Sequence, residues 1–304
     1  MASPADTVSL AESFMRIHHR VLVLLPVLFL LCGNALAHPV LWQAKVGNST
    51  IYLFGTVHLL PNDTQWRFPA LDQALSQSKT LYIELTDDDQ ASIAPLILRY
   101  GLDAEHPLST QLSQRENDTL ANAAHVAGLP GGAQTLQPMK PWLAALTLSV
   151  APLLKAGMDP SQSVDKQLKT QMTAAGKPVY GLETAEQQIQ FLANLSSPMQ
   201  LAFLRDTLRD VDKSTEELRS LVDAWKQGNV AAIAKLENDE LKTREPELYR
   251  QLIVERNENW AAKIKDMMIR QPGTVFIAVG AAHLAGPDSV QAQLAKLGVI
   301  VQQE

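Results

Sequence analysis

A nine-residue pattern occurs twice in this chain of 304 residues. Residues 51–59 read IYLFGTVHL, and residues 276–284 read FIAVGAAHL. Each copy is an apolar run of strand length followed by glycine, two small residues and histidine, and the glycine permits a tight turn and a close backbone approach. Each copy therefore predicts a strand that ends by presenting an imidazole at the edge of a sheet. If the two strands lie side by side, His58 and His283 meet in one site.

Two acidic residues stand at similar positions in the chain. Glu84 lies in the apolar run 80–85, and Glu183 ends the run 177–183. An ionised carboxylate within an apolar strand is costly to bury unless it is paired or bound to a metal. In open α/β sheets, ligands bind beyond the carboxyl ends of the strands. If the strands are parallel neighbours, all four side chains point into one crevice.

Two imidazoles and one or two carboxylates are suitable ligands for a divalent metal such as Zn, Mn, Co or Fe(II). We expect His58, His283 and Glu84 to bind such a metal, and a carboxylate that stays uncoordinated to activate a metal-bound water. Simpler roles are also open. A histidine after a strand is often structural, and Glu183 is placed to cap the helix that follows it.

The order of apolar runs indicates an α/β fold. Strands are expected at 41–46, 49–54, 80–85, 177–183, 274–279 and 299–301, and helices after Pro69 and at 141–156, 164–175 and 289–296. Further helices are expected within 90–176 and 184–271. This alternation predicts a mixed central sheet flanked by helices. The repeated pattern also predicts two related halves with a helical insertion.

Three features of the helical regions bear on function. Arg256 and Asn257 could hold an oxyanion or a substrate carboxylate, although exposed polarity on a helix is the simpler interpretation. Asp165 is interpreted as a residue on the exposed face of a helix. The apolar helix 141–156 is too short for a membrane span, so we expect it to be buried or to face a lipid or a ligand.

The N-terminal 37 residues resemble a secretory signal peptide. Residues 21–31 are apolar, basic residues precede them, and the ALA sequence at 35–37 fits a cleavage site after Ala37. Because the segment before Met15 is acidic, Met15 is the expected start. The expected mature domain, 38–304, is therefore periplasmic or secreted. A retained N-terminal anchor is the alternative.

Composition narrows the classes of function. Cleavage would remove two basic and two acidic residues and leave the net charge at −6. An acidic chain without a basic cluster argues against nucleic acid as a partner. The single cysteine, Cys32, lies in the signal segment, so the mature chain has no disulfide and no thiolate nucleophile. The Gly-x-Ser-x-Gly motif of a nucleophile elbow is also absent from the sequence, which argues against a serine hydrolase of that type.

Six short motifs, taken in order, resemble the TraB/PrgY/GumN family. They are LW at 41–42, YLFGTVH at 52–58, EL at 84–85, GKPVYGLET at 176–184, ERN at 255–257 and VGAAHLAG at 279–286. The similarity covers nearly all of the expected mature chain and is strongest to the exported bacterial GumN-type branch.

The resemblance implies a reaction class. The family includes the animal Tiki proteins, which are metal-dependent peptidases, and it is similar to the erythromycin esterase and ChaN haem-binding group. By this resemblance His58, His283 and Glu84 are metal ligands. Glu84 is also expected to be catalytic, together with Glu183, Arg256 and Asn257, which match family positions.

Two other functions fit the same residues. A binding protein would use the crevice to hold a peptide, a metal or a tetrapyrrole without turnover. A partner in envelope or polysaccharide assembly would need none of the strand-end residues. The site could also be completed across a homodimer.

Overall fold

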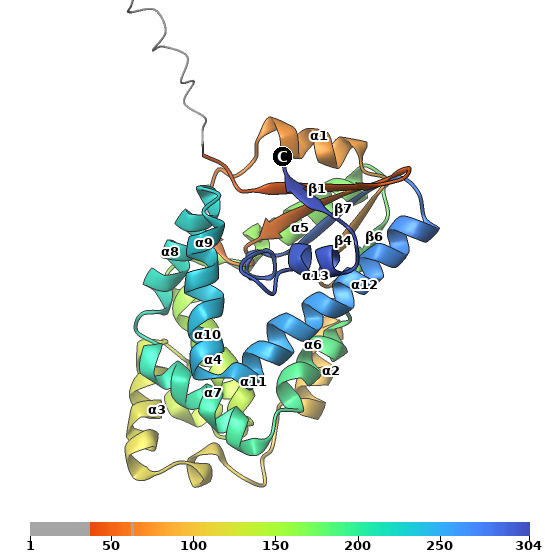
Figure 1. The fold of residues 1–304 in the computed structure, drawn as a ribbon. Coiled ribbons are helices and arrows are strands. Elements are labelled where there is room, and N and C mark those ends of the chain that lie inside the picture. The colour runs from red at the N-terminus through yellow and green to blue at the C-terminus, as the bar shows by residue number, and fades with distance from the viewer. Residues whose placement is uncertain (1–36, 62–63) are drawn as a thin grey trace, which may run out of the picture. The chain divides into compact units, whose positions relative to one another are not determined.

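A six-stranded mixed sheet forms the centre of the structure, a computed structural model that describes residues 37–61 and 64–304. The strand order is β6-β4-β7-β2-β1-β8 (Figure 1). The strands are β1 Leu41–Val46, β2 Ser49–Thr56, β4 Thr80–Ile83, β6 Val179–Gly181, β7 Thr274–Gly280 and β8 Val301–Gln303. A second, two-stranded sheet pairs β3 Leu60–Pro61 with β5 Met158–Asp159.

Four neighbouring strands of the large sheet are parallel. β4 pairs in parallel with β6 and with β7, and β7 pairs in parallel with β2. Their carboxyl ends therefore lie at one edge of the sheet. β1 pairs with β2 as an antiparallel hairpin. The tight turn between them contains Gly47, whose positive φ of 56° suits glycine. The expected mixed sheet with helices around it is confirmed.

Alternating residues of the strands bury two separate cores. Phe276 and Ala278 of β7 belong to the core under α1 and α5, whereas Ile277 and Val279 belong to the core under α12 and α13. This is the period of two that a strand covered on both faces requires. The covering helices are α1 Pro69–Gln77, α5 Val164–Ala174, α12 Glu255–Arg270 and α13 Val290–Lys296.

The remaining helices pack beside the sheet and around two further hydrophobic clusters (Figure 1). They are α2 Gln90–Tyr100, α3 Gln114–Val126, α4 Pro141–Lys155, α6 Ala185–Ala193, α7 Ser197–Asp210, α8 Ser214–Lys226, α9 Val230–Ile233, α10 Glu240–Arg244 and α11 Pro246–Tyr249. Two π-helical segments interrupt this region, η4 Ala234–Asp239 and η5 Arg250–Val254. Short 3₁₀ turns are η1 Leu108–Gln111, η2 Gly132–Leu136, η3 Pro160–Gln162 and η6 Ala281–Leu284.

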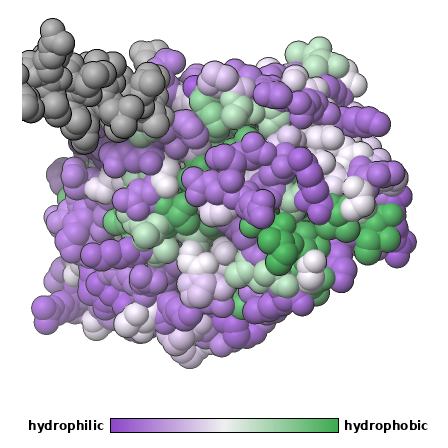
Figure 2. All heavy atoms as spheres, turned by 45° about the horizontal axis from the view of Figure 1, so that its top comes forward, coloured by the Kyte–Doolittle hydropathy of each residue, from purple (hydrophilic) through white to green (hydrophobic). Residues whose placement is uncertain are grey.

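Residues 38–304 form one compact unit. Within the described residues, every helix is too short or too polar to cross a membrane. The face seen in Figure 2 is largely hydrophilic, with hydrophobic residues in patches between the polar ones. The predicted signal segment, including the start at Met15, lies outside the described residues apart from Ala37.

The two copies of the repeated pattern lie side by side, because β2 and β7 are neighbours. They are offset by one residue, since Gly55 pairs with Val279 and Thr56 pairs with Gly280. The second copy then continues into the 3₁₀ turn η6, whereas the first continues into a bend. The copies are therefore adjacent without being equivalent, and the predicted duplication of two halves stays a prediction.

Candidate functional site

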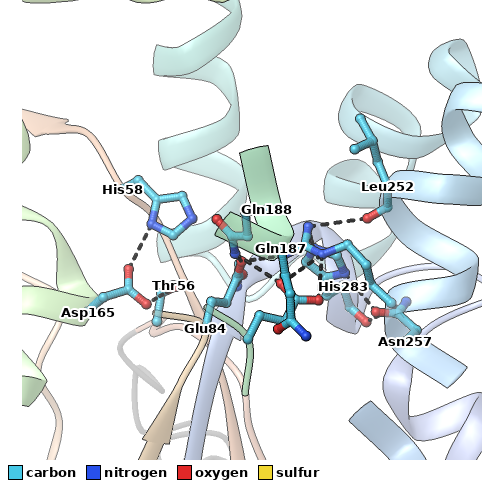
Figure 3. Close-up of polar contacts among 12 residues, drawn as sticks. Thr56, His58, Glu84, Asp165, Gln187, Gln188, Leu252, Asn257 and His283 are labelled. Carbon is cyan, nitrogen blue, oxygen red and sulfur yellow. Dashed lines mark hydrogen bonds and ion pairs between the residues drawn. The ribbon is translucent and has the colours of Figure 1, made fainter. Parts of the chain in front are cut away.

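The four strand-end residues follow the carboxyl ends of the parallel strands, and Figure 3 shows three of them, His58, Glu84 and His283. Gly280 is at the centre of this region. A Cβ atom added to Gly280 would lie 3.1 Å from Glu84 Oε1, 3.6 Å from His283 Cδ2 and 3.7 Å from His58 Nε2. The absence of a side chain at Gly280 thus allows three of the candidates to approach one another closely. Glu183 joins them through the guanidinium of Arg256.

The guanidinium of Arg256 connects the acidic residues with His283. Its Nη2 donates to Glu84 Oε2 at 2.7 Å and to Glu183 Oε2 at 2.9 Å, and its Nε donates to both Glu183 oxygens at 3.1 Å. Its Nη1 donates to His283 Nε2 at 3.1 Å and to the Leu252 carbonyl at 3.3 Å. All five N–H groups of this guanidinium therefore have a partner.

Arg256 controls the charge of Glu84. Burial raises the pKa of the Glu84 carboxyl, but the guanidinium of Arg256, with smaller contributions from His283, His58 and the Gly280 amide, holds that pKa well below its usual range. The Gly280 N–H donates to Glu84 Oε1 at 2.7 Å. Glu84 is therefore ionised at neutral pH, and its low pKa makes it a weak base.

His283 is buried and uncharged. Only 5 % of the residue is exposed, and burial lowers the pKa of His283 to about 3, with Arg256 acting in the same direction. Because Nε2 accepts from Arg256, Nδ1 carries the proton and donates to Asn257 Oδ1 at 2.7 Å. Asn257 Nδ2 donates to the Asp288 carbonyl at 2.8 Å, which fixes the amide in this orientation.

His58 has a different environment. Its Nδ1 lies 2.9 Å from Asp165 Oδ2, and Thr56 Oγ1 donates to Asp165 Oδ1 at 2.9 Å. Burial lowers the pKa of His58, but the charge and hydrogen bond of Asp165 outweigh it and raise the pKa to about 9. Protein surrounds the ring without covering it, since 61 % of the side chain is exposed. In the described part of the chain, Nε2 makes no hydrogen bond.

Residues of α6 and of the π-helical segments η4 and η5 form hydrogen bonds to the residues of the site. Gln188 of α6 donates to both Glu84 Oε2 and Glu183 Oε2 at 3.1 Å. Asn238, in the π-helical segment η4, donates to the carbonyls of Ala282 and Ala285 at 2.9 and 3.0 Å and so clamps the turn that carries His283. The Leu252 carbonyl that accepts from Arg256 belongs to the other π-helical segment, η5. π-Helical turns are frequent at functional sites.

The site opens into two hollows. The larger has a volume of about 570 Å³ and is lined by His58, Glu84, Arg256 and His283 together with several leucines. The smaller has a volume of about 290 Å³ and also reaches His58 and Glu84. His58 and Glu84 therefore line both hollows and lie where the two meet.

The predicted metal ligands have suitable chemistry but an unsuitable arrangement. Among the residues that the structure describes, no group of three His, Cys, Asp or Glu side chains is placed to hold a metal ion. The lone pair of His283 is directed to Arg256, and both Glu84 oxygens accept hydrogen bonds. The cation that these groups share in this arrangement is the guanidinium of Arg256, so the residues do not fit a metal as they stand.

Six of the residues predicted from the sequence lie together in the structure. They are His58, Glu84, Glu183, Arg256, Asn257 and His283. Arg256 and Asn257 are buried rather than on an exposed helix face. Glu183 does not cap the helix after it, because Thr184 is the N-cap of α6 and the Glu183 carboxylate pairs with Arg256.

Three residues of the site are not predicted by any sequence pattern. Asp165, expected on an exposed helix face, is instead the partner of His58. Gln188 and Asn238 carry no sequence signal of a role in the site. Asp165 lies in the first turn of α5, two residues after the N-cap Ser163, so its position on a helix can be predicted from the sequence. Its partner His58 lies more than 100 residues away in the sequence, and no local pattern indicates that contact.

The comparisons with known proteins agree with the motifs. The TraB/PrgY/gumN family profile matches residues 40–303. The uncharacterized protein YbaP of Escherichia coli (strain K12) is 27 % identical over 265 residues, which are 86 % of this chain and 94 % of that protein. An uncharacterized protein of Treponema pallidum (strain Nichols) is 23 % identical over 299 residues, which are 89 % of this chain and 87 % of that protein.

No solved structure matches the chain. The family match covers most of the sequence, including every strand-end residue of the site. This protein therefore belongs to the TraB/PrgY/gumN family.

Proposed function

We propose that this protein is an exported hydrolase that cleaves acyl bonds, with peptides as the substrate class that the family resemblance implies. The observation that carries the proposal is the geometry of His58. Its Nδ1 is held by Asp165, its Nε2 lies near Gly280, and the residue lines both hollows. An imidazole with one nitrogen fixed by a carboxylate and the other free is suited to proton transfer.

The reaction can be written with His58 alone as the group that moves a proton. In its neutral form, Nε2 takes a proton from water while the water oxygen bonds to the acyl carbon. The resulting imidazolium, paired with Asp165, then gives that proton to the leaving amine or alcohol as its bond to carbon breaks. The raised pKa of His58, about 9, predicts that the neutral form and the rate increase as the pH rises toward that value.

The other predicted catalytic residues act through position and charge. Every N–H group of Arg256 already has a protein partner, so Arg256 supports the site as a fixed positive charge rather than as a donor to substrate. Glu84 and Glu183 hold this guanidinium, and Asn257 holds His283. We assign Glu183 and Asn257 as positioning residues.

The family resemblance predicts that the reaction depends on a metal ion. Two imidazoles and a carboxylate are the right ligand types for Mn, Co, Zn or Fe(II), but Arg256 would first have to leave Glu84 and His283. Elemental analysis decides this point. We would compare protein purified without chelator with a His58→Ala/His283→Ala variant. Near-stoichiometric metal that the variant lacks would support a metal site.

To test the hydrolase proposal, the expected mature domain, residues 38–304, is assayed with quenched fluorescent peptide libraries and with a panel of simple esters. We expect His58→Gln to reduce the rate by roughly 10²- to 10⁴-fold, the usual contribution of acid–base catalysis. The matched control is His106→Gln, because His106 also pairs with an aspartate but is remote from the crevice. Equal rates for wild type and His58→Gln would overturn the assignment. Tight peptide binding without turnover would favour a binding protein instead.

A further inference from the structure

The two hollows beside His58 and Glu84 differ in chemistry. The smaller one is lined mainly by charged and polar residues, among them Asp88, Lys166 and Gln188. The larger one is mainly apolar away from the site, and its volume of about 570 Å³ lies within the usual range of ligand pockets, roughly 300–1,000 Å³. A substrate that passes His58 therefore has the charged side chains of Asp88 and Lys166 on one side and a group of leucines on the other.

Six leucines line the larger hollow, and the five of them that lie on helices give it an apolar wall away from the sheet edge. Each is only half-buried, although leucine is among the residues most often buried completely. They come from four separate elements, α4, α8, α10 and η5: Leu153, Leu218, Leu221, Leu241 and Leu252. Apolar side chains left in contact with water at one concave place indicate a ligand that covers them.

The leucine-lined hollow is built on fixed elements. Leu218 and Leu221 of α8 pack against the main hydrophobic core from their buried sides. Leu252 belongs to the π-helical segment whose carbonyl accepts from Arg256. The apolar wall is therefore connected to the same residues that fix Glu84 and His283. A side chain lying against this wall has a defined position relative to His58.

We infer that the leucine-lined hollow is the specificity pocket of the site and that it receives a bulky aliphatic or aromatic side chain of a peptide, next to the bond that His58 acts on. This inference rests on the proposed function for the position of the bond, but not for the binding of the side chain. The occupant is apolar because the leucines offer aliphatic carbon, and an acidic side chain would lose hydration and meet the carboxylates of Glu217 and Glu237.

The experiment measures binding separately from cleavage. Fluorescent peptides that differ at one position (Ala, Leu, Phe, Asp or Lys) are titrated against the His58→Gln variant by anisotropy, and are incubated with wild type for mass spectrometry. We expect Leu and Phe peptides to bind on the order of ten to a hundred times more tightly than Ala peptides, as burial of one large apolar side chain gives.

Neighbouring leucines on one helix provide a matched pair of variants. Leu153→Asp places a charge in the hollow, whereas Leu154→Asp changes an exposed leucine outside it. Only Leu153→Asp should abolish the preference for Leu and Phe. A second variant, Leu218→Trp, fills the hollow and should shift the preference toward Ala. Thermal melting checks that each variant is folded.

The outcomes distinguish the two proposals. Preferential binding of apolar peptides without cleavage would keep the pocket and overturn the hydrolase. Cleavage with the same preference in wild type and Leu153→Asp would keep the hydrolase and overturn the pocket. The pocket would also be overturned if no peptide bound and none was cleaved.

Discussion

The Nδ1 atom of His58 lies 2.9 Å from Oδ2 of Asp165, and the two residues come from segments that are 107 positions apart in the sequence. This contact leaves Nε2 of the same ring near Gly280, where it lines the larger hollow. The second histidine, His283, has neither nitrogen free, since Arg256 and Asn257 occupy both. The two histidines of the repeated pattern therefore have different chemistry.

Removal of the Asp165 charge should lower the pKa of His58. In Asp165→Asn the raising effect of the carboxylate is lost and the effect of burial remains, so the pKa should fall from about 9 to the ordinary value of 6.5 or below. Titration of the His58 ring by NMR measures this shift. Asp103→Asn, which changes the partner of the remote His106, is the control. An unchanged pKa in Asp165→Asn would contradict the assignment.

Mild acid should destabilise the protein through His283. Its pKa is about 3 in the folded chain and near 6.5 when unfolded, so between these values the unfolded chain binds the extra proton and stability decreases as the pH falls. Between pH 7 and pH 5 this loss is about 2 kcal/mol.

The variant His283→Gln should lack that part of the acid dependence. Urea unfolding at pH 7 and pH 5 measures the difference between wild type and variant. The exposed His125 supplies the control His125→Gln, which should follow wild type. The same loss of stability in His283→Gln as in wild type would show that His283 is not buried in its neutral form.

Arg256→Met should be strongly destabilising. It leaves two buried carboxylates, Glu84 and Glu183, without their shared cation, and breaking a buried ion pair in this way costs about 3–5 kcal/mol. Urea unfolding measures the cost, and Arg270→Met, on the exposed end of the same helix, should change stability by less than about 0.5 kcal/mol. The triple variant with Glu84→Gln and Glu183→Gln should regain part of the loss. No regain would mean that charge pairing is not the cause.

Gly280→Ala should impair the site more than the fold. Gly280 has a φ of −48°, which alanine adopts easily, so the added methyl group acts through its contact with Glu84 Oε1 at 3.1 Å and its position near His58 Nε2. We expect a loss of at most about 1 kcal/mol in stability and a reduction of any hydrolysis by at least roughly tenfold, since small misplacements at a reacting centre are costly.

Gly55→Ala provides the contrast. Its new methyl group would meet the backbone Cα of Ala281 at 3.1 Å, where little can move aside. Thermal melting and the peptide assay on both variants should therefore show a larger stability loss for Gly55→Ala. The reverse order of stabilities would contradict this account of the two glycines.

The sequence by itself determined where β1, β2, β4, β6 and β7 lie and which residues follow them. It did not predict the short strands β3 and β5, and the last strand is Val301–Gln303 rather than 299–301. The apolar runs have a local signature, and ligand sites in parallel sheets gather at the carboxyl edge. These two rules place His58, Glu84, Glu183 and His283 at one edge if the strands are parallel neighbours, and the structure supplies that pairing. The ordered motifs likewise indicate the family to which the chain belongs.

Only the tertiary structure decided how these residues share their protons and charges. A one-residue offset between β2 and β7 and a different turn after each strand leave His58 exposed and His283 buried. The positions of Asp165 and Arg256 beside them depend on how helices pack against the sheet edge. Packing of this kind is set by side-chain volume and long-range contact rather than by sequence spacing, so the sequence pattern predicted where the site lies but not its internal bonds.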